Sequence, residues 1–533
     1  MDKKFLFAML LSLGTVWLFN HYTAKSPQQT EAGGVVTVGA VQEVVAGQPI
    51  KVPTTETLYK PMVLDVELHD AKKHVEEQII DVQTPYTKAS LSTHGATLVN
   101  LEFKEHEGQN GTPLKTVVSK GSLDEEQRKK GCFLLALDGQ TPYHYTFIDK
   151  QELENDTVVR FSAATDEWII HKAYHFAHDS YRVDVDLALE PKSDRSAPVK
   201  PRLFLSAPFV GEIADDAITQ LAWNEQRQSI EKTEANAVHG LAWFWAGPKP
   251  IFGAEDRYFV HALFDDEQKF VQRAYVKTFD AHNIASIFEG PEITEKQEWK
   301  LSFYMGPKLF DHMNNVDDRL EEVLSFGWFS WICKGLLKLL SWLYDLVGNF
   351  GWAIILLAVV IKLPFTPLSM YARKQMEIMQ HYQPTINKIR LKYKHDLKMQ
   401  HEELMKFYRE HNIAPTAHLI GCLPLVLQLP ILFALNRVLG SYLDLYQSPF
   451  LGWITDLSSK DPYYVIPVLM GISMVWQQSM APVTDEKQRV MMWFVSVVMT
   501  VVFAGLPAGL VLYWLFNNLL TIGEDYLRKF VLN

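Results

Sequence analysis

The second half of the chain contains apolar stretches long enough to cross a membrane, and one of them carries a lysine. The stretch Gly348–Leu368 is about as long as the roughly 20 apolar residues that a helix needs to span a hydrocarbon core. Lys362 lies two-thirds of the way along it. Placing a lysine near mid-helix costs about 2.5–3.5 kcal/mol, so an ionisable residue in a span indicates function. The alternative is a lysine that snorkels its ammonium group to the nearer interface.

The 533 residues divide into two unlike halves. Residues up to about Pro307 are polar and strand-like after one N-terminal apolar segment, whereas long apolar runs dominate from about Leu324 onward. The formal net charge of −11 comes mostly from the polar half and argues against a nucleic-acid partner there. The three cysteines, Cys132, Cys333 and Cys422, are too scattered to form a disulfide framework or a metal knuckle.

At the N-terminus, Lys3 and Lys4 precede an apolar segment from Phe5 to Phe19. Such a segment is either a cleaved secretory signal or a retained anchor. No tight small-x-small cleavage site follows it, which favours a retained anchor over residues 1–24 with the N-terminus in the cytoplasm. A linker rich in Gln, Thr, Gly and Val is expected over residues 25–57.

Residues 58–320 show alternation of apolar and polar residues with a period of two. The clearest run is Tyr181–Leu189, in which every second residue is apolar. Clusters of Gly, Asn, Asp and Pro separate such runs, and this pattern predicts an antiparallel sandwich rather than a βαβ fold. Because the domain follows an anchor with a positive inner flank, we expect it to be exported. The other runs are Val158–Phe161, Trp168–His171, Ala274–Phe279 and Trp299–Met305.

The polar half offers one candidate group of metal ligands, His171, His175 and His178. On a strand the first two share a face and His178 faces away, so the three imidazoles do not converge as metal ligands would. Solvated or hydrogen-bonded strand histidines are therefore the favoured interpretation. The sequence shows no Ser-His-Asp context, paired-carboxylate motif or G-x-x-x-x-G-K-[ST] loop, so we predict no enzyme activity, cofactor or metal site.

Residues 321–346 connect the two halves and are predicted to form an amphipathic helix. Within them, Ser330–Asp345 has a narrow polar stripe containing Lys334 and Lys338, and a broad Trp and Leu face. A helix of this kind lies in the plane of the membrane interface, because a full span would bury both lysines.

Residues 347–533 are expected to form a core of five transmembrane helices. With the N-terminal anchor, the chain is expected to cross the membrane six times. The segment between the first two, Arg373–Asn412, has more Lys and Arg than Asp and Glu, and the positive-inside rule therefore places it in the cytoplasm. Counting loops onward from there puts both termini in the cytoplasm. The five core helices are expected at about 348–371, 417–440, 463–480, 490–505 and 506–527.

The charged cytoplasmic segment 372–412 is predicted to be an antiparallel helical hairpin. Apolar residues recur at three- and four-residue steps, with a break near His395-Asp396 and a kink or restart at Gln383-Pro384. One face is rich in methionine and includes Met376, Met379 and Met399. These side chains either offer an adaptable surface to varied partner proteins or simply hold the hairpin together.

Polar residues also occur inside four of the expected spans. They are Lys362, Gln428, Asn436, Ser473, Gln477, Gln478, Asn517, Asn518 and Thr521. Such residues often join membrane helices through hydrogen bonds. However, we find no carboxylate within the apolar runs of these spans, the last of which is Leu506–Ile522, that would neutralise Lys362. An unpaired cation persists most easily beside water. The sequence therefore predicts a hydrophilic cavity, open to the cytoplasm and to lipid, with Lys362 as its positive centre.

Several short stretches of the sequence are together specific in their order and spacing. They are Thr84-Pro85-Tyr86, Ser92-Thr93-His94-Gly95, Val347-Gly348-Asn349-Phe350-Gly351, Gln383-Pro384, Gly421-Cys422-Leu423-Pro424, Gln428-Leu429-Pro430-Ile431, Asp461-Pro462-Tyr463-Tyr464 and Leu506-Pro507-Ala508-Gly509. In these stretches, and over essentially its whole length, the chain resembles the YidC family of membrane protein insertases from Gram-negative bacteria. The family places an arginine at the position of Lys362, and lysine keeps the charge but loses the bidentate fork.

The resemblance implies a protein of the bacterial inner membrane that inserts and helps to fold nascent membrane proteins, alone or with the Sec translocon. Ribosomes and targeting factors are further implied partners. It implies an α+β multi-domain membrane protein, with a periplasmic β-supersandwich similar to sugar-mutarotase folds, although fold does not imply activity. A client tail would enter a groove formed by Lys362, Gln428, Gln478, Asn517, Asn518 and Thr521. The apolar helix of the client would slide along Leu429, Leu432 and Phe433, and the cytoplasmic hairpin would carry Met376, Met379, Pro384 and Met399.

Two other classes of protein are disfavoured. A secondary transporter also places a charge near the membrane midplane, but it usually shows internal repeats and broken helices in both halves, and neither is visible here. A membrane-anchored sugar-modifying enzyme would need convergent catalytic groups in the sandwich, and it would leave the five further spans unexplained.

Overall fold

The structure, a computed structural model, describes residues 67–70, 74–107, 112–118, 131–209, 218–234, 242–243, 249–279, 284–324, 330–411, 423–480 and 486–532. The chain forms two compact units, Met1–Leu324 and Ser325–Asn533. The predicted anchor (1–24) and linker (25–57) lie outside the described residues.

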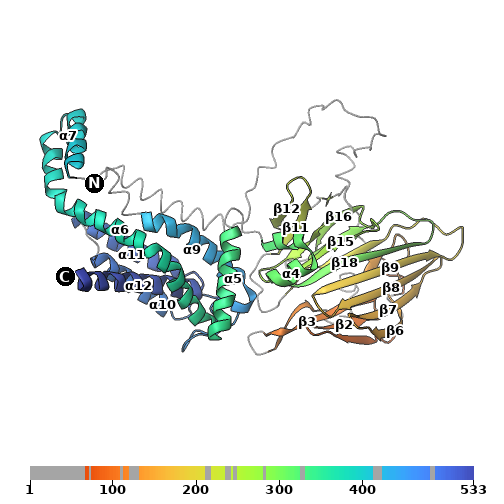
Figure 1. Cartoon of the computed structure of the whole chain (residues 1–533). Coiled ribbons are helices and arrows are strands. Elements are labelled where there is room, and N and C mark those ends of the chain that lie inside the picture. The colour runs from red at the N-terminus through yellow and green to blue at the C-terminus, as the bar shows by residue number, and fades with distance from the viewer. Residues whose placement is uncertain are drawn as a thin grey trace, which may run out of the picture. The chain divides into compact units, whose positions relative to one another are not determined.

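The first unit is an antiparallel β structure, as the alternation in the sequence predicts (Figure 1). Its described strands are β1 (Ile79–Gln83), β2 (Thr87–Ser92), β3 (Thr97–Glu107), β4 (Pro113–Val118), β5 (Leu135–Ala136), β6 (Thr146–Glu152), β7 (Asp156–Ala164), β8 (Trp168–Ala177), β9 (Arg182–Pro191), β10 (Arg202–Ser206), β11 (Thr219–Asn224), β12 (Ser229–Glu234), β13 (Ala242–Trp243), β14 (Phe252–Glu255), β15 (Phe259–Asp265), β16 (Arg273–Thr278), β17 (Ile284–Glu289) and β18 (Gln297–Pro307).

Three sheets build this unit. A nine-stranded sheet has the order β12-β11-β14-β15-β18-β9-β8-β7-β6, a five-stranded sheet the order β13-β16-β17-β10-β5, and a four-stranded sheet the order β1-β2-β3-β4. Both smaller sheets pack on the same face of the large one through aromatic contacts. Phe303 on β18 lies 5.8 Å, between ring centroids, from Phe288 on β17, and Phe259 on β15 lies 4.8 Å from Phe103 on β3. The sandwich predicted from the sequence is confirmed.

Lys172 on β8 is a buried lysine at the centre of this packing. Strand alternation places it on the core face beside Ile170 and Tyr174, and its side chain is 1% exposed. Its Nζ donates hydrogen bonds to the carbonyl oxygens of Ala96 at 2.8 Å and Phe133 at 2.5 Å, with Gly95 O at 3.2 Å. Burial lowers the pKa of Lys172 to about 7. The ammonium thus joins β8 of the large sheet to segments that adjoin both smaller sheets.

After β18, helix α4 (Phe310–Val316) and the 3₁₀ helix η3 (Asp318–Leu324) close the first unit. Lys232 on β12 donates a hydrogen bond of 2.6 Å to the carbonyl oxygen of Val323 and forms an ion pair of 2.7 Å with Glu255 on β14. These contacts fix the end of the first unit on its large sheet.

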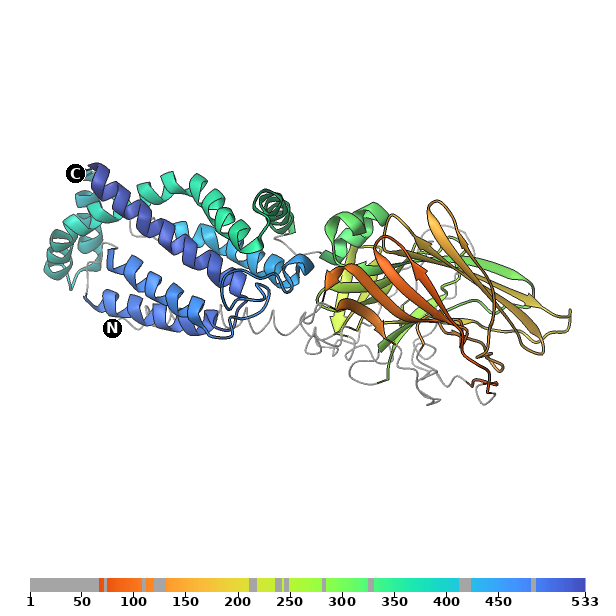
Figure 2. The ribbon, with the colours of Figure 1, turned by 90° about the horizontal axis from the view of Figure 1, so that it is seen from below.

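The second unit is helical. Its described helices are α5 (Ser330–Val347), α6 (Phe350–Lys392), α7 (Leu397–Glu410), α9 (Leu423–Ser441), α10 (Val465–Met480), α11 (Glu486–Phe503) and α12 (Ala508–Leu532), with a 3₁₀ turn η5 (Leu443–Leu445). Helix α12 packs against α6, α9 and α10, and α11 packs beside α10 (Figure 2). Among the described helices, α6 is the one that is both long and apolar enough to cross a membrane. Val465–Met480 and Val490–Phe503 are shorter apolar helices.

Helix α5 lies across the ends of the bundle helices, so the chain must turn sharply before α6 begins (Figures 1 and 2). Gly348 ends α5 in a left-handed conformation, with φ of 68°, and its N–H bonds to Tyr344 O at 2.7 Å. Asn349 then caps α6, because its side-chain oxygen accepts hydrogen bonds from the N–H groups of Gly351 and Trp352. Within the predicted range 321–346, the structure has α5 from Ser330 onward, with Cys333, Leu336, Leu340 and Leu343 buried, whereas residues up to Leu324 belong to η3.

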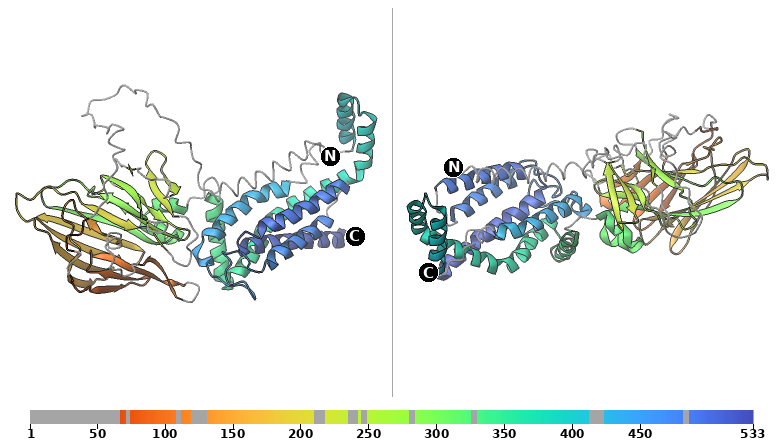
Figure 3. Two further views of the ribbon diagram at one scale, coloured as in Figure 1. Left: turned by 180° about the vertical axis from the view of Figure 1, so that it is seen from behind. Right: turned by 90° about the horizontal axis from the view of Figure 1, so that it is seen from above.

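Helix α6 differs from the prediction in being continuous from the bundle into the hairpin that it forms with α7. It extends through Pro384 to Lys392, so the restart, one of the two alternatives predicted at Gln383-Pro384 beside a kink, is wrong. Each of its three prolines, Pro364, Pro367 and Pro384, removes one hydrogen bond, and the remaining bonds suffice to maintain the helical backbone in a helix of 43 residues. The predicted break near His395-Asp396 is confirmed, since Asp396 caps α7. Figure 3 shows the end of α6 and α7 together extending beyond the bundle.

Candidate functional site

A small cavity of about 40 Å³ lies between α6, α9 and α12. Three polar side chains of its lining come from three different helices, with Lys362 on α6, Gln428 on α9 and Asn517 on α12. The remaining lining residues are Ile361, Phe365, Ser369, Ile431 and Tyr513. A polar cavity of this size has room for water. The structure thus brings together three of the polar residues that the sequence singled out.

Lys362 is held on one side of this cavity by α12. Its Nζ donates a hydrogen bond of 2.6 Å to Thr521 Oγ1, and the Thr521 hydroxyl in turn donates to the carbonyl oxygen of Asn517 at 2.8 Å. The Lys362 side chain is 13% exposed. The Thr521 hydroxyl therefore donates its proton to the helix backbone and accepts the hydrogen bond of Lys362 on its oxygen. This arrangement fixes the orientation of the Lys362 side chain.

The structure also provides a carboxylate partner for Lys362, so the prediction of an unpaired cation is wrong. Glu524 Oε2 lies 3.7 Å from Lys362 Nζ. The other oxygen of Glu524 accepts a hydrogen bond of 2.6 Å from Thr366 Oγ1 on α6. Glu524 was overlooked because it lies just beyond Ile522, where the apolar run ends. A signal was nevertheless present, since Asn517, Thr521 and Glu524 follow each other at helical steps of four and three residues.

Two further ion pairs join α6 to α12 beyond Lys362. Arg373 pairs with Asp525, whose side chain is 3% exposed, and Glu377 pairs with Arg528. Together with Lys362–Glu524 they are called here the α6–α12 ion pairs. Their spacing on α6 covers 15 residues, or roughly 22 Å of helix. They fasten the two helices together from the cavity towards the hairpin.

The other predicted groove residues occupy different environments. Asn518 is 3% exposed and donates a hydrogen bond of 3.0 Å to Ser473 Oγ on α10, so it joins two helices. Gln478, also on α10, does not belong to the residues that line the described cavity. Leu429, Leu432 and Phe433 are half-buried on α9, and Leu432 packs against the apolar core of the bundle.

The hairpin formed by the end of α6 and α7 has a small apolar core of its own. Ile386 on α6 and Tyr408 on α7 are buried there, and Met379 packs against them. Met399 is 41% exposed, and the exposed residues Leu391 and Leu397 flank the turn between the helices. One predicted methionine thus holds the hairpin together, and another faces outward.

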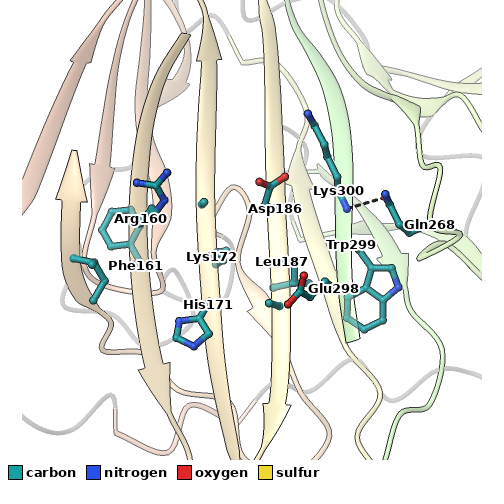
Figure 4. Close-up of a pocket in the computed structure, with 13 residues that line it drawn as sticks. Arg160, Phe161, His171, Lys172, Asp186, Leu187, Gln268, Glu298, Trp299 and Lys300 are labelled. Atoms are coloured by element: carbon teal, nitrogen blue, oxygen red, sulfur yellow. Dashed lines mark hydrogen bonds between the residues drawn. The ribbon is translucent and has the colours of Figure 1, made fainter. Parts of the chain in front are cut away.

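A second hollow, of about 520 Å³, lies on the outer face of the nine-stranded sheet. Figure 4 shows Arg160, His171, Asp186, Glu298 and Lys300 around it, on neighbouring strands. Four of these are already in ion pairs: Arg160 with Asp149 at 3.0 Å, Asp186 with His175 at 2.9 Å, Glu298 with Lys296 at 3.0 Å and Lys300 with Asp184 at 3.4 Å. The charges of this hollow are therefore largely compensated within the protein.

The three strand histidines do not act as one group. His171 lies at the hollow, whereas His175 Nδ1 is 2.9 Å from Asp156 and its Nε2 is 2.9 Å from Asp186. His178 Nε2 is 2.9 Å from Thr157 Oγ1. The carboxylates of Asp186, first, and Asp156 accept hydrogen bonds from the His175 ring and thereby raise the pKa of His175. Within the described ranges no cluster of three or more His, Cys, Asp or Glu residues is arranged to hold a metal ion.

The outward side of the helical unit is apolar, whereas its polar groups are turned inward. Ile472 on α10 is 58% exposed and Val501 on α11 is 71% exposed, in contrast to the buried pair of Asn518 and Ser473. Such inverted polarity defines a multi-span membrane protein with a polar site between its helices.

Comparison with known proteins gives the particular family. Residues 79–339 match the family described as YidC periplasmic domain, and residues 342–531 match the family described as 60Kd inner membrane protein. Membrane protein insertase YidC of Geobacter metallireducens is 30% identical over 553 residues, covering 99% of this chain and 98% of the relative. The insertase YidC of Syntrophus aciditrophicus is 29% identical over 552 residues, covering 99% of each.

Among solved structures, an active YidC insertase with its first transmembrane domain resolved is 19% identical, covers 87% of this chain and 95% of its own, and has a TM-score of 0.37. The chain belongs to the YidC family of membrane protein insertases. It is an inner-membrane protein with a periplasmic domain, its clients are membrane proteins, and its function is insertion rather than enzymatic catalysis.

Proposed function

We propose that the cavity around Lys362 is the inner part of a groove that receives the hydrophilic tail of a client. The observation that carries this proposal is that Lys362, Gln428 and Asn517, from three helices, line one cavity. A polar tail that enters it finds hydrogen-bonding groups within the membrane, which shortens the path it must cross through hydrocarbon. The ammonium group of Lys362 favours tails with acidic residues.

The apolar helix of the client then moves into lipid along α9. Leu429, Leu432 and Phe433 lie on the same helix as Gln428, and each is half-buried rather than enclosed. A client helix in contact with them exchanges protein contacts for lipid contacts without exposing its backbone to water. Gln478, Asn518 and Thr521 contribute to the groove indirectly, since Asn518 joins α12 to α10 and Thr521 positions Lys362.

The hairpin of α6 and α7 is the first contact of a client in this proposal. Met399, Leu391 and Leu397 present exposed apolar side chains around its turn, while Met376 is half-buried and Met379 supports the fold of the hairpin. Pro384 lies within α6 between the bundle and this turn. Exposed methionine and leucine side chains adapt to apolar segments of differing shape.

The proposed topology has both termini and the hairpin in the cytoplasm and residues 58–320 in the periplasm. It includes an anchor at 1–24, a linker at 25–57, an interfacial helix at 321–346 and an insertase core at 347–533. The excess of Lys and Arg in the hairpin supports this orientation. The Sec translocon, the ribosome and targeting factors are the proposed partners.

Proteoliposomes that contain only this protein test the proposal. A client with an acidic tail should become protease-protected in wild-type vesicles and in Lys362→Arg vesicles, and remain accessible with Lys362→Gln. Equal protection by all three proteins would refute the role of Lys362. Uptake of a small solute in place of client insertion would favour a transporter.

A further inference from the structure

Lys362 and Glu524 form a loose ion pair beside the cavity. Their closest approach of 3.7 Å exceeds the roughly 2.7–2.9 Å of a charge-assisted hydrogen bond. The short contacts of both residues go elsewhere, from Lys362 to Thr521 at 2.6 Å and from Thr366 to Glu524 at 2.6 Å. Each partner is therefore positioned by a threonine rather than by the other charge.

We propose that Glu524 is a specificity-determining residue for insertion, because it is an internal counter-ion that an acidic client tail must displace from Lys362. This inference rests on the proposed function of Lys362 and names the chemistry of the tail that Lys362 accepts. An ammonium group has three donors, and Thr521 uses one of them at 2.6 Å. A carboxylate of the client can bond directly to Lys362, while Glu524 keeps its hydrogen bond to Thr366.

The neighbouring α6–α12 ion pairs differ from this one. Arg373 contacts Asp525 directly, and the Asp525 side chain is 3% exposed, so that pair is enclosed between the helices. The side chain of Glu377 is 45% exposed, and its pair with Arg528 lies far along α6 from the cavity. Among the described α6–α12 ion pairs, Lys362–Glu524 is the one that combines a long contact with a place at the cavity.

A displaceable counter-ion makes the groove selective for charge. Without a client, Glu524 offsets the positive charge of Lys362, so a neutral tail encounters little net field. An acidic tail competes with Glu524 for Lys362 and is also repelled by it, so only tails with sufficient negative charge bind well. Removing the charge of Glu524 should therefore strengthen the binding of acidic tails much more than the binding of neutral ones.

The test uses two clients that differ only in whether their tails carry aspartates or asparagines. A photo-crosslinker at Phe365, which lines the cavity, captures each client during insertion into membranes that contain the full-length protein. The measured quantity is the crosslinking yield of the client with aspartates divided by the yield of the client with asparagines. The amount of insertase cancels in this ratio. Glu524→Gln should raise this ratio at least about fivefold, the lower end of typical coupling between ligands.

Glu377→Gln is the matched control, because it converts a carboxylate of another α6–α12 ion pair into an amide away from the cavity. It should leave the ratio at its wild-type value. An unchanged ratio in Glu524→Gln, or an equal rise in Glu377→Gln, would overturn the inference. If Glu524→Gln does not accumulate, Glu524→Asp is used instead, because it moves the carboxylate away from Lys362 by one methylene. Glu524→Asp should raise the crosslink ratio by a smaller amount. An unchanged ratio in Glu524→Asp would equally overturn the inference.

Lys362→Gln separates this inference from the proposed function beneath it. If Lys362→Gln retains the wild-type ratio, Lys362 does not read tail charge and the proposed function fails. If Lys362→Gln abolishes the preference for aspartate while Glu524→Gln behaves as wild type, Lys362 keeps its role and only the role of Glu524 is lost.

Discussion

Lys362 donates a hydrogen bond of 2.6 Å to Thr521, and this contact joins the two helices that border the cavity. Thr521 accepts through its hydroxyl oxygen and donates to Asn517 O at 2.8 Å, so its orientation is set by the backbone of α12. The lysine therefore meets a preorganised acceptor on one side and the cavity on the other. A cation held in this way remains available to a client.

Lys362→Ala should impair client insertion by about tenfold or more, the effect of losing an interaction of about 1.4 kcal/mol. Lys362→Arg should preserve insertion, because the charge matters more than the shape of the group. Complementation of a strain depleted of its own insertase, with client insertion followed by protease protection, measures both. Full insertion with Lys362→Ala at normal protein levels would contradict the groove hypothesis.

The sequence predicted the fold of both units more fully than it predicted the contacts of the site. Alternation along β9 was sufficient to predict an antiparallel sheet, because Val183, Val185 and Leu187 are all buried as their spacing requires. Lys172 shows the limit of the same pattern. Its position on the core face can be read from the period of two, but its carbonyl partners come from loops distant in the chain.

For a related reason, the sequence predicted the polar residues that line the cavity but not their carboxylate neighbours. Lys362, Gln428 and Asn517 were found because polar residues are rare in apolar spans. Glu524 and Asp525 lie in a polar stretch, where acidic residues are common and carry little information. Their roles emerge only because α12 continues to Leu532 and carries them back against α6.

The ion pair of Arg373 and Asp525 should stabilise the helical unit. Asp525→Asn removes the charge that contacts Arg373 directly in a largely enclosed place, and breaking buried pairs costs about 3–5 kcal/mol. We therefore expect a lower unfolding temperature in detergent and lower membrane levels. The double variant Arg373→Met/Asp525→Leu should recover much of the stability, because apolar side chains replace both charges. Equal stability of Asp525→Asn and wild type would show that the pair contributes nothing.

His175 should make the stability of the periplasmic sandwich depend on pH. Hydrogen bonds from its ring to the carboxylates of Asp186 and Asp156 raise its pKa in the folded protein above the ordinary value of 6.5. The stabilisation is therefore fully present below about pH 6.5, and it is lost as the pH rises through the raised pKa of the folded state. A loss of about 1 kcal/mol lowers the unfolding temperature of a domain of this size by roughly 2–4 °C.

The measurement compares unfolding temperatures of wild type and His175→Gln between about pH 6 and pH 9. The difference between the two proteins should shrink as the pH rises. The comparison is necessary because Lys172, whose pKa is lowered to about 7, changes the stability in the opposite sense over the same range. His171→Gln, at the neighbouring exposed position of the strand, is the control and should retain the wild-type dependence. A constant difference between wild type and His175→Gln would exclude the predicted linkage.

The apolar core of the hairpin provides the last prediction. Ile386 is 1% exposed and packs with Tyr408, which is 8% exposed, so Ile386→Ala should destabilise the hairpin by about 2–5 kcal/mol. The bundle should stay folded, because Ile386 lies outside its core. We expect faster trypsin cleavage among the lysines of the hairpin, together with fewer crosslinks from Met399 to a nascent client. Asn387→Ala is the matched control, since Asn387 is exposed beside Ile386 on α6, outside the apolar surface around the turn, and its loss should not open the hairpin. If Ile386→Ala opens the hairpin to trypsin while client insertion continues at the wild-type rate, the hairpin does not receive clients.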